Sequence, residues 1–281
     1  MKQNSEKLGF LYVANKQKFI AESKISSKSL KRFTKNPVCL ICTKELYTED
    51  LKNYFDIILF NDEIKTTSYI SKIIGLLQTP FDRTLFLDCD TFIADEIDEL
   101  FPLLDLVDFS CTTEPTLHTF SNIDLKYKNI FPEFHSGIIL YKNNEVIKKL
   151  FNDWLSICVT NNIKFDMPGL REAVIENISN VRFSILPDHY NLHAFKTMVV
   201  LYNKVKIIHV RLGYKWGLLT PHFLSFEKMD KFAKRINKIT YKRLYIRHLG
   251  IIPYNYTPAN ILHFLKKKLG FKHVSKHHHS T

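Results

Sequence analysis

The sequence predicts an α/β protein with a doubly wound, mostly parallel sheet, followed by a basic helical C-terminal segment. Over residues 1–227, short apolar runs of the kind found in strands buried on both faces alternate with longer stretches of helical periodicity. The chain has 281 residues, 45% of them hydrophobic, which suffices for a large core without disulfides or a structural metal. Residues 228–281 hold 13 Lys and Arg against one acidic residue, Asp230.

The first half of the chain starts with a strand and alternates with helices. Apolar runs predict strands at residues 8–14, 38–43 and 56–60, with a helix over residues 17–33 between the first two. Thr66 and Ser68 are residue types that cap helices, so we expect a helix over residues 69–78, which Pro80 ends.

The second half continues the same alternation. Helices are predicted over residues 145–158 and 166–177, and strands at residues 83–88, 107–112, 136–141 and 206–210. Strands interleaved with helices imply a mostly parallel sheet, whose ligands bind outside the carboxyl ends of the strands. The sequence contains neither a G-x-G-x-x-G nor a Walker motif, so no dinucleotide or P-loop site is predicted.

Cysteine usage and hydropathy indicate a cytoplasmic protein. Four of the five cysteines, at positions 39, 42, 89 and 111, lie in predicted buried strands, which suits core residues in a reducing compartment. Apolar stretches fall short of the roughly 20 residues that cross a bilayer. The N-terminal residues lack the pattern of a signal peptide, so secretion by that route is not expected.

The charge of the chain is concentrated at one end. The net charge is +12, and residues 1–227 are neutral overall, so residues 228–281 carry all of the excess and form a separate segment. Apolar residues recur there at helical spacing among lysines, at residues 229–239 and again at 261–269, which predicts two basic amphipathic helices. Their apolar faces either pack on the main domain or, with the lysines, dock on an anionic membrane surface. No nucleic-acid motif accompanies the charge, so no nucleic-acid partner is expected.

Two aspartates end the strand predicted at residues 83–88. Asp88 and Asp90, separated by Cys89, stand where the chain leaves the sheet. Carboxylates so placed suit Mg²⁺ or Mn²⁺, which take one or two protein carboxylates and fill their remaining positions with phosphate oxygens and water. Two carboxylates this close repel each other unless a cation neutralises them. The pattern predicts a divalent cation site, although an aspartate at a strand end can also form an Asx turn.

The order of the motifs resembles the metal-dependent D-x-D glycosyltransferases of the GT-A (Rossmann-like) fold, nearest to glycosyltransferase family 8. The resemblance covers most of residues 8–216 and implies a nucleotide-sugar transferase domain over residues 1–227. Around the D-x-D it is carried by Tyr69 with Thr79-Pro80-Phe81, by Phe134-His135-Ser136-Gly137, by Phe165-Asp166-Met167-Pro168, and by His209-Val210-Arg211-Leu212-Gly213-Tyr214-Lys215-Trp216.

The resemblance implies roles for individual residues. Asp88, Asp90 and His209 would hold one Mn²⁺ or Mg²⁺ against the donor diphosphate, and a cation such as Lys215 would share the charge of the leaving group. The residues expected to be catalytic are Asp166, Glu114 and Lys215. Those expected to bind the donor are Tyr12, Ala14 and Asn15 at the nucleoside, and Tyr69, Lys72, Asp88, Cys89, Asp90, His135, Gly213 and Lys215 around the diphosphate and sugar.

The predicted function is transfer of a sugar from a nucleotide diphosphate donor, UDP-linked, to a hydroxyl of a glycan, lipid-linked or protein acceptor. The chain departs from the family pattern, since His135 and Met167 stand where the family has Asn and Gln, and no Pro separates Lys215 from Trp216. Two alternatives stay open. One is a haloacid dehalogenase-type phosphatase or phosphotransferase with Asp88 as nucleophile. The other is an inactive module that binds a membrane or a polyanion.

Overall fold

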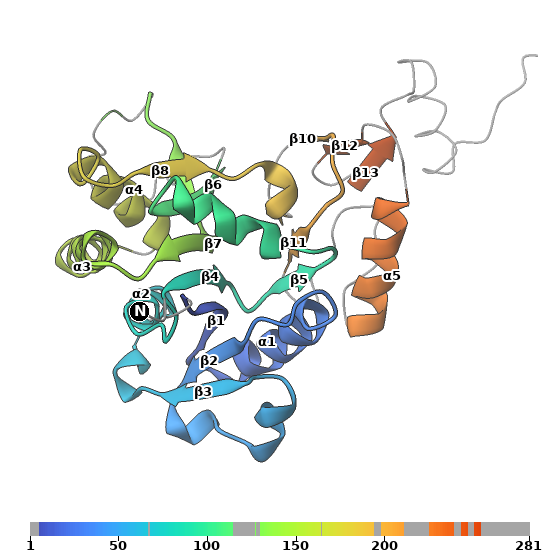
Figure 1. Cartoon of the computed structure of the whole chain (residues 1–281), viewed down its shortest axis with the longest axis horizontal. Coiled ribbons are helices and arrows are strands. Elements are labelled where there is room, and N and C mark those ends of the chain that lie inside the picture. The colour runs from blue at the N-terminus through green and yellow to red at the C-terminus, as the bar shows by residue number, and fades with distance from the viewer. Residues whose placement is uncertain are drawn as a thin grey trace, which may run out of the picture.

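The computed structural model describes residues 6–66, 68–114, 127, 130–163, 165–193, 198–210, 225–238, 243–246 and 250–253. Its centre is a seven-stranded sheet in the order β3-β2-β1-β4-β7-β6-β8 (Figure 1). The strands are β1 (Leu8–Ala14), β2 (Val38–Cys42), β3 (Ile57–Phe60), β4 (Arg83–Leu87), β6 (Phe109–Glu114), β7 (Glu133–Lys142) and β8 (Phe183–Ile185).

The direction of the strands confirms the predicted α/β class. β3, β2, β1 and β4 run parallel, and β8 runs parallel to β6. β7 is antiparallel to both of its neighbours, β4 and β6. The carboxyl ends of β1 and β4 therefore share one edge of the sheet with the start of β7, and residues from all three strands meet there.

Helices cover both faces of this sheet (Figure 1). Along β1, successive side chains point to opposite faces, so Phe10 joins the core on the side of α1, whereas Leu11 joins the core built with α2, α3 and α4. The α-helices are α1 (Gln17–Leu30), α2 (Ser68–Leu76), α3 (Glu145–Thr160), α4 (Asp166–Glu176) and α5 (Phe226–Asn237). Short 3-10 helices are Lys44–Leu46, Glu49–Asn53, Asp62–Ile64, Asp98–Asp105 and Asp188–Tyr190.

Two smaller sheets lie beside the central one. The first, in the order β5-β11-β9, joins β5 (Thr91–Ile93), β11 (Ile207–His209) and β9 (Leu192–His193). The strand predicted at residues 206–210 is β11, and it belongs to this small sheet rather than to the central one. The second, in the order β10-β12-β13, joins β10 (Met198–Leu201), β12 (Arg243–Ile246) and β13 (Gly250–Pro253).

The C-terminal segment contains the first predicted amphipathic helix as α5, and the second, at residues 261–269, lies outside the described residues. The buried face of α5, formed by Met229, Phe232, Ala233 and Ile236, packs in a cluster with Phe92 of β5 and Ile208 of β11. The first interpretation of this face, packing on the main domain, is therefore confirmed. Residues 243–253 contribute strands that pair with β10, which the sequence analysis did not foresee. Among the residues that the structure describes, no helix is both long and apolar enough to traverse a bilayer.

Candidate functional site

The candidate site lies at the sheet edge where β1 and β4 end. Asp88 and Asp90 occupy the turn between β4 and β5, and Thr91 N–H closes this turn on the Asp88 carbonyl at 3.2 Å. An open hollow of about 470 Å³ adjoins the turn. It is lined by Val13, Asn15, Phe19, Tyr69, Ser71, Lys72, Phe86, Asp88, Cys89 and Asp90. Six of the residues predicted to bind the donor, the two D-x-D aspartates included, thus line one hollow.

Lys72, on α2, is the central cation of one side of the site. Its Nζ lies 3.1 Å from Asp88 Oδ1 and 3.1 Å from Asp166 Oδ2, and it donates to Ser136 Oγ at 3.1 Å. Ser136 Oγ in turn donates to Asp166 Oδ2 at 2.6 Å. Burial lowers the pKa of Lys72, but the carboxylates of Asp166 and Asp88 outweigh this and hold the pKa above its ordinary value. The ammonium is therefore charged and fixes both carboxylates.

His209, on β11, forms the other side of the site with Asp90. Asn191 fixes the tautomer of the ring, because its Nδ2 donates to Thr112 Oγ1 at 2.8 Å and its Oδ1 accepts from His209 Nδ1 at 3.1 Å. With its proton on Nδ1, a neutral ring turns the lone pair of Nε2 toward Asp90 Oδ1, 3.1 Å away. A lone pair and a carboxylate oxygen repel at this distance unless a proton or a cation lies between them.

The donor atoms of this side also fit a metal ion. Ligand atoms of Asp88, Asp90 and His209 all lie within 4.8 Å of one another. Burial raises the pKa of Asp88 above its ordinary value, and Lys72 and His209 only partly oppose this effect. Burial lowers the pKa of His209, but Asp90 and Asp88 outweigh it and raise that pKa. The folded site thus attracts positive charge, and two carboxylates with one imidazole are a donor set that suits Mn²⁺ or Mg²⁺.

The main chain at Asp88 is tied to the core by a chain of hydroxyl groups. Thr91 Oγ1 donates to the Asp88 carbonyl at 2.8 Å, Ser26 of α1 lies 2.7 Å from Thr91, and the Tyr12 hydroxyl lies 2.8 Å from Ser26. Tyr12 is 0% exposed and packs edge-on against Phe55. The prediction that Tyr12 stacks on a nucleoside is therefore wrong, because alternation along β1 directs its ring into the core.

The other residues at the end of β1 are also constrained. Ala14 is fully buried within the sheet, so its side chain cannot contact a nucleoside, and only its main chain could do so. Asn15 donates both amide hydrogens, to the carbonyls of Ile64 at 3.1 Å and Thr66 at 3.0 Å. Its side-chain oxygen is the atom left for a ligand. Tyr69 is 37% exposed where it lines the hollow, and its ring packs 5.9 Å from that of Phe165.

The two predicted catalytic carboxylates lie on different elements, Asp166 on α4 and Glu114 on β6. Asp166, the first residue of α4, lies inside the site on Lys72 and Ser136, and the N-cap position is Phe165 rather than Asp166. Glu114 ends β6, buried, opposite Glu133 of β7 in the strand register. Cys89 is buried with its sulfur 3.3 Å from the Val13 carbonyl, and burial raises the pKa of its thiol well above the ordinary value.

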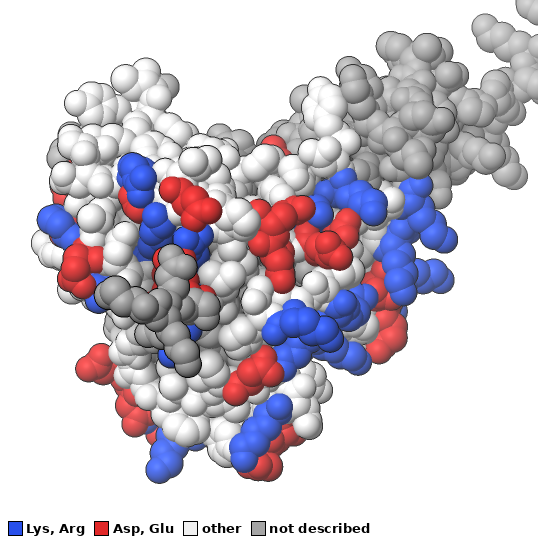
Figure 2. Space-filling view, viewed as in Figure 1, with Lys and Arg blue, Asp and Glu red and all other residues white. Residues whose placement is uncertain are grey.

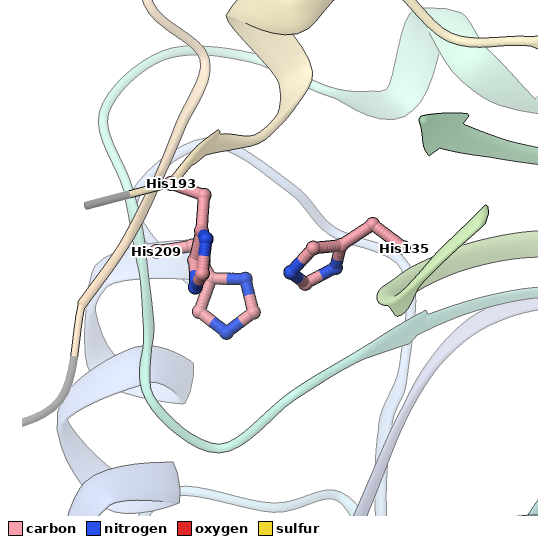
Figure 3. Close-up of side chains that lie close together, drawn as sticks. All are labelled: His135, His193 and His209. Atoms are coloured by element: carbon pink, nitrogen blue, oxygen red, sulfur yellow. The ribbon is translucent and has the colours of Figure 1, made fainter. Parts of the chain in front are cut away.

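Three histidine rings meet beside the aspartates (Figure 3). His135 of β7 faces His193 of β9 and His209 of β11, with ring centroids 4.7 Å and 5.0 Å from it. Gly137 makes this approach possible, because a Cβ there would lie less than 3.0 Å from His209 Cε1, His135 Cε1 and Asp88 Oδ2. His135, which was predicted to bind the donor, lies in this cluster, two residues before Gly137.

Sequence reasoning missed three residues of the site. Ser136 stood within a quoted motif but received no role, and Asn191 and His193 received none either. Alternation along the short strand β9 places Asn191 and His193 on one side, a signal that was available in the sequence. The predicted Gly213 and Lys215, together with Arg211 and Trp216, lie outside the described residues.

Comparison with known proteins identifies the fold. No family model and no curated protein matches the sequence. Solved structures do match: the mouse xyloside xylosyltransferase 1 in its apo form has 15% identity and a TM-score of 0.52 over 72% of this chain and 97% of its own. The galactosyltransferase LgtC, solved with donor and acceptor sugar analogues, has 11% identity and a TM-score of 0.54 over 82% and 97%.

A third match is the apo form of the glycosyltransferase GlyE of Streptococcus pneumoniae TIGR4. It has 15% identity and a TM-score of 0.55, over 82% of this chain and 64% of its own. Identities this low carry the architecture and leave the chemistry to the residues of the site. The resemblance stated from the motifs is confirmed at the level of architecture: this chain has the GT-A fold.

Proposed function

We propose that the protein transfers a sugar from a nucleotide diphosphate donor, UDP-linked, to a hydroxyl of a glycan, lipid-linked or protein acceptor. The observation that carries this proposal is the convergence of Asp88, Asp90 and His209, from two separate sheets, beside a hollow at the carboxyl end of β4. In open α/β sheets this edge is where ligands bind. The structural neighbours named above are all described as glycosyltransferases, which supports this class and does not favour the phosphatase alternative.

A divalent cation fits the carboxylate side of the site. Asp88, Asp90 and His209 would hold Mn²⁺ or Mg²⁺, and the bound ion would supply Lewis-acid stabilisation of the departing diphosphate. Asn191 keeps the proton of His209 on Nδ1, so that Nε2 presents its lone pair. The hydroxyl chain through Thr91 holds the main chain of Asp88 in place, so the donor set is organised in advance of binding.

The remaining residues position the donor and the acceptor. Lys72 holds the carboxylates of Asp88 and Asp166, and it acts on the donor through them rather than as a free cation. Asp166, fixed also by Ser136, offers its other carboxylate oxygen to a sugar or acceptor hydroxyl. Tyr69 offers an exposed ring to the base. Lys215, with Gly213, completes the diphosphate contacts, and Glu114 binds acceptor hydroxyls, as the motif resemblance implies.

Binding of UDP in the presence of Mn²⁺ tests this function. We expect UDP with Mn²⁺ to raise the melting temperature of the wild-type protein, because a ligand bound only by the folded state stabilises it. Asp90→Asn and His209→Gln should lower the affinity for Mn²⁺-UDP at least about 100-fold, and donor hydrolysis to UDP should fall with it. Asp50→Asn is the matched control, since Asp50 is an exposed partner of Lys24. Wild-type affinity in both site variants would disprove the proposal.

We propose further that the basic side of the molecule rests on an anionic membrane surface. Lys228, Lys231, Lys234, Arg235 and Lys238 are exposed on the outer face of α5. Lys28 of α1 joins them over the Phe226 ring, and Figure 2 shows the Lys and Arg side chains gathered along the side formed by these two helices. Each basic residue near such a surface contributes about 1 kcal/mol.

Flotation with vesicles tests this surface. Deletion of residues 228–281 would remove the packed face of α5, so charge reversal is the cleaner change. We expect Lys231→Glu with Lys238→Glu to reduce flotation with phosphatidylserine vesicles about tenfold or more. Neutral phosphatidylcholine vesicles and the double variant Lys52→Glu with Lys44→Glu, in the two 3-10 helices that follow β2, serve as controls. Equal flotation of both double variants would refute the proposed surface.

A further inference from the structure

The three histidines beside the aspartates form a donor set of different chemistry from the D-x-D site. His135, His193 and His209 come from β7, β9 and β11, and their ring centroids lie 4.7 to 5.0 Å apart. One nitrogen of each ring lies within 4.8 Å of the others. Figure 3 shows the His135 ring facing the other two. Three imidazoles make a site typical of zinc, whereas carboxylates and water suit manganese and magnesium.

We propose that His135, His193 and His209 bind one Zn²⁺ ion, at a site that shares His209 with the carboxylate site. Three nitrogens at about 2.1 Å from a tetrahedral zinc ion lie about 3.4 Å apart, so small side-chain rotations close the present arrangement around an ion. A water molecule would complete the four-coordinate site. His135 binds through Nε2, so its proton moves to Nδ1 and the present contact from Gly137 N–H to Nδ1 at 3.1 Å is given up.

The burial of the cluster supports a bound ion rather than three solvated rings. His135 and His209 are 5% and 3% exposed. The proton of His209 is held on Nδ1 by Asn191, which leaves Nε2 as its ligand atom. Gly137 leaves room between the rings where any side chain would intrude. Three elements thus deliver one imidazole each to a single small volume.

The shared histidine gives this site a consequence. His209 Nε2 has one lone pair, so it binds either the ion between His135 and His193 or the ion beside Asp90. Zn²⁺ in the histidine site therefore competes with Mn²⁺ in the carboxylate site. This inference concerns zinc binding alone and stands whether or not the protein transfers sugars.

Zinc binding is best measured with the full chain, in which His277, His278 and His279 are first changed to Ala so that the terminal histidine run contributes no signal. We expect this background protein to bind one Zn²⁺ per chain in equilibrium dialysis. With Co²⁺ as a probe it should show the visible absorption of a nitrogen-ligated tetrahedral ion. His193→Ala should lower the Zn²⁺ affinity by at least about 100-fold, more than the loss of a hydrogen-bond partner of a ligand.

Three further variants separate the outcomes. His189→Ala is the matched control, because His189 stacks on Tyr190 and lies outside the cluster, and it should keep Zn²⁺ binding. Asp90→Asn should keep Zn²⁺ binding but lose Mn²⁺ binding. If the protein transfers no sugar, Zn²⁺ binding should still depend on the three histidines and not on Asp90. His135→Asn replaces His193→Ala if the latter does not fold. No Zn²⁺ bound to the background protein, or Zn²⁺ kept in His193→Ala and lost in Asp90→Asn, would overturn the inference.

Discussion

The two sides of the site handle charge in different ways. On the α2 side, Lys72 supplies a permanent cation that contacts both Asp88 and Asp166 at 3.1 Å. On the β11 side, Asp90 faces His209, whose charge depends on a proton. The first side has its cation within the chain, whereas the second needs a proton or a metal ion from outside. Lys72 thus gives the site a fixed positive charge, whereas the positive charge beside Asp90 can come and go with a proton on His209 or a metal ion.

The largest expected effect lies on the α2 side. Lys72→Met leaves the buried Asp166 carboxylate and Asp88 without their cation, so the free energy of unfolding should fall by about 3 kcal/mol. Urea unfolding measures it. Lys52→Met removes an exposed, solvent-screened pair with Glu49 and should leave the free energy of unfolding nearly unchanged. Equal losses in both variants would show that Lys72 is no more than a surface cation.

A smaller effect is expected behind His209. Asn191→Ala removes the acceptor of His209 Nδ1, so the ring loses its fixed tautomer and Mn²⁺ affinity should fall about 10- to 100-fold. Isothermal titration with Mn²⁺ measures it. The control is Asn177→Ala, which removes a side chain bonded to Asp153 and Ala173 at a distance from the site. If Mn²⁺ binds equally well to both variants, Asn191 does not organise the site.

The hydroxyl chain from the core should contribute about 1 kcal/mol. Tyr12→Phe removes the hydrogen bond to Ser26 and should cost about 1 kcal/mol of stability, with weaker Mn²⁺ binding because the Asp88 main chain is held less firmly. Tyr141→Phe removes a similar buried bond, to the Leu76 carbonyl. It should cost as much stability and leave Mn²⁺ binding unchanged. Weaker Mn²⁺ binding in both variants would show that the hydroxyl groups of Tyr12, Ser26 and Thr91 have no specific role in holding Asp88.

The smallest effect is a pH dependence of the metal-free protein. The folded state raises the pKa of both His209 and Asp88, so it binds their protons more tightly than the unfolded chain does. Stability should therefore fall as the pH rises, from about pH 4 for Asp88 and from about pH 6.5 for His209, up to their folded pKa values. Asp90→Asn should flatten the His209 part of the decline. Stability that rises through this range would contradict the assignment.

The sequence predicted the elements better than their assembly. Apolar runs placed β1 and β2 within one residue of their observed ends, because strands buried on both faces need continuous apolar side chains. The reversed direction of β7 leaves no mark in composition or periodicity, since it depends on the neighbours of the strand. The same holds for the small sheet that brings β11 beside β5.

The structure brings predicted residues together where a motif marks a sheet edge, whereas the prediction failed at Tyr12, whose side chain points inward. Asp88, Asp90 and His209 were chosen by pattern, and the structure brings them together. Tyr12 was misjudged because the sequence near the end of a strand does not show to which face of the sheet a side chain points. The partners of Lys72 could not be read from the chain, because they come from segments 64 and 94 residues away.

Among the residues that the structure describes, Gly137 is the one position at which the close approach of these side chains depends on the absence of a side chain. Asp88, His135 and His209 share the space that its missing side chain leaves, so a methyl group there would displace side chains from β7, from β11 and from the β4–β5 turn. A larger residue at position 137 should therefore separate these side chains while the rest of the fold stays in place.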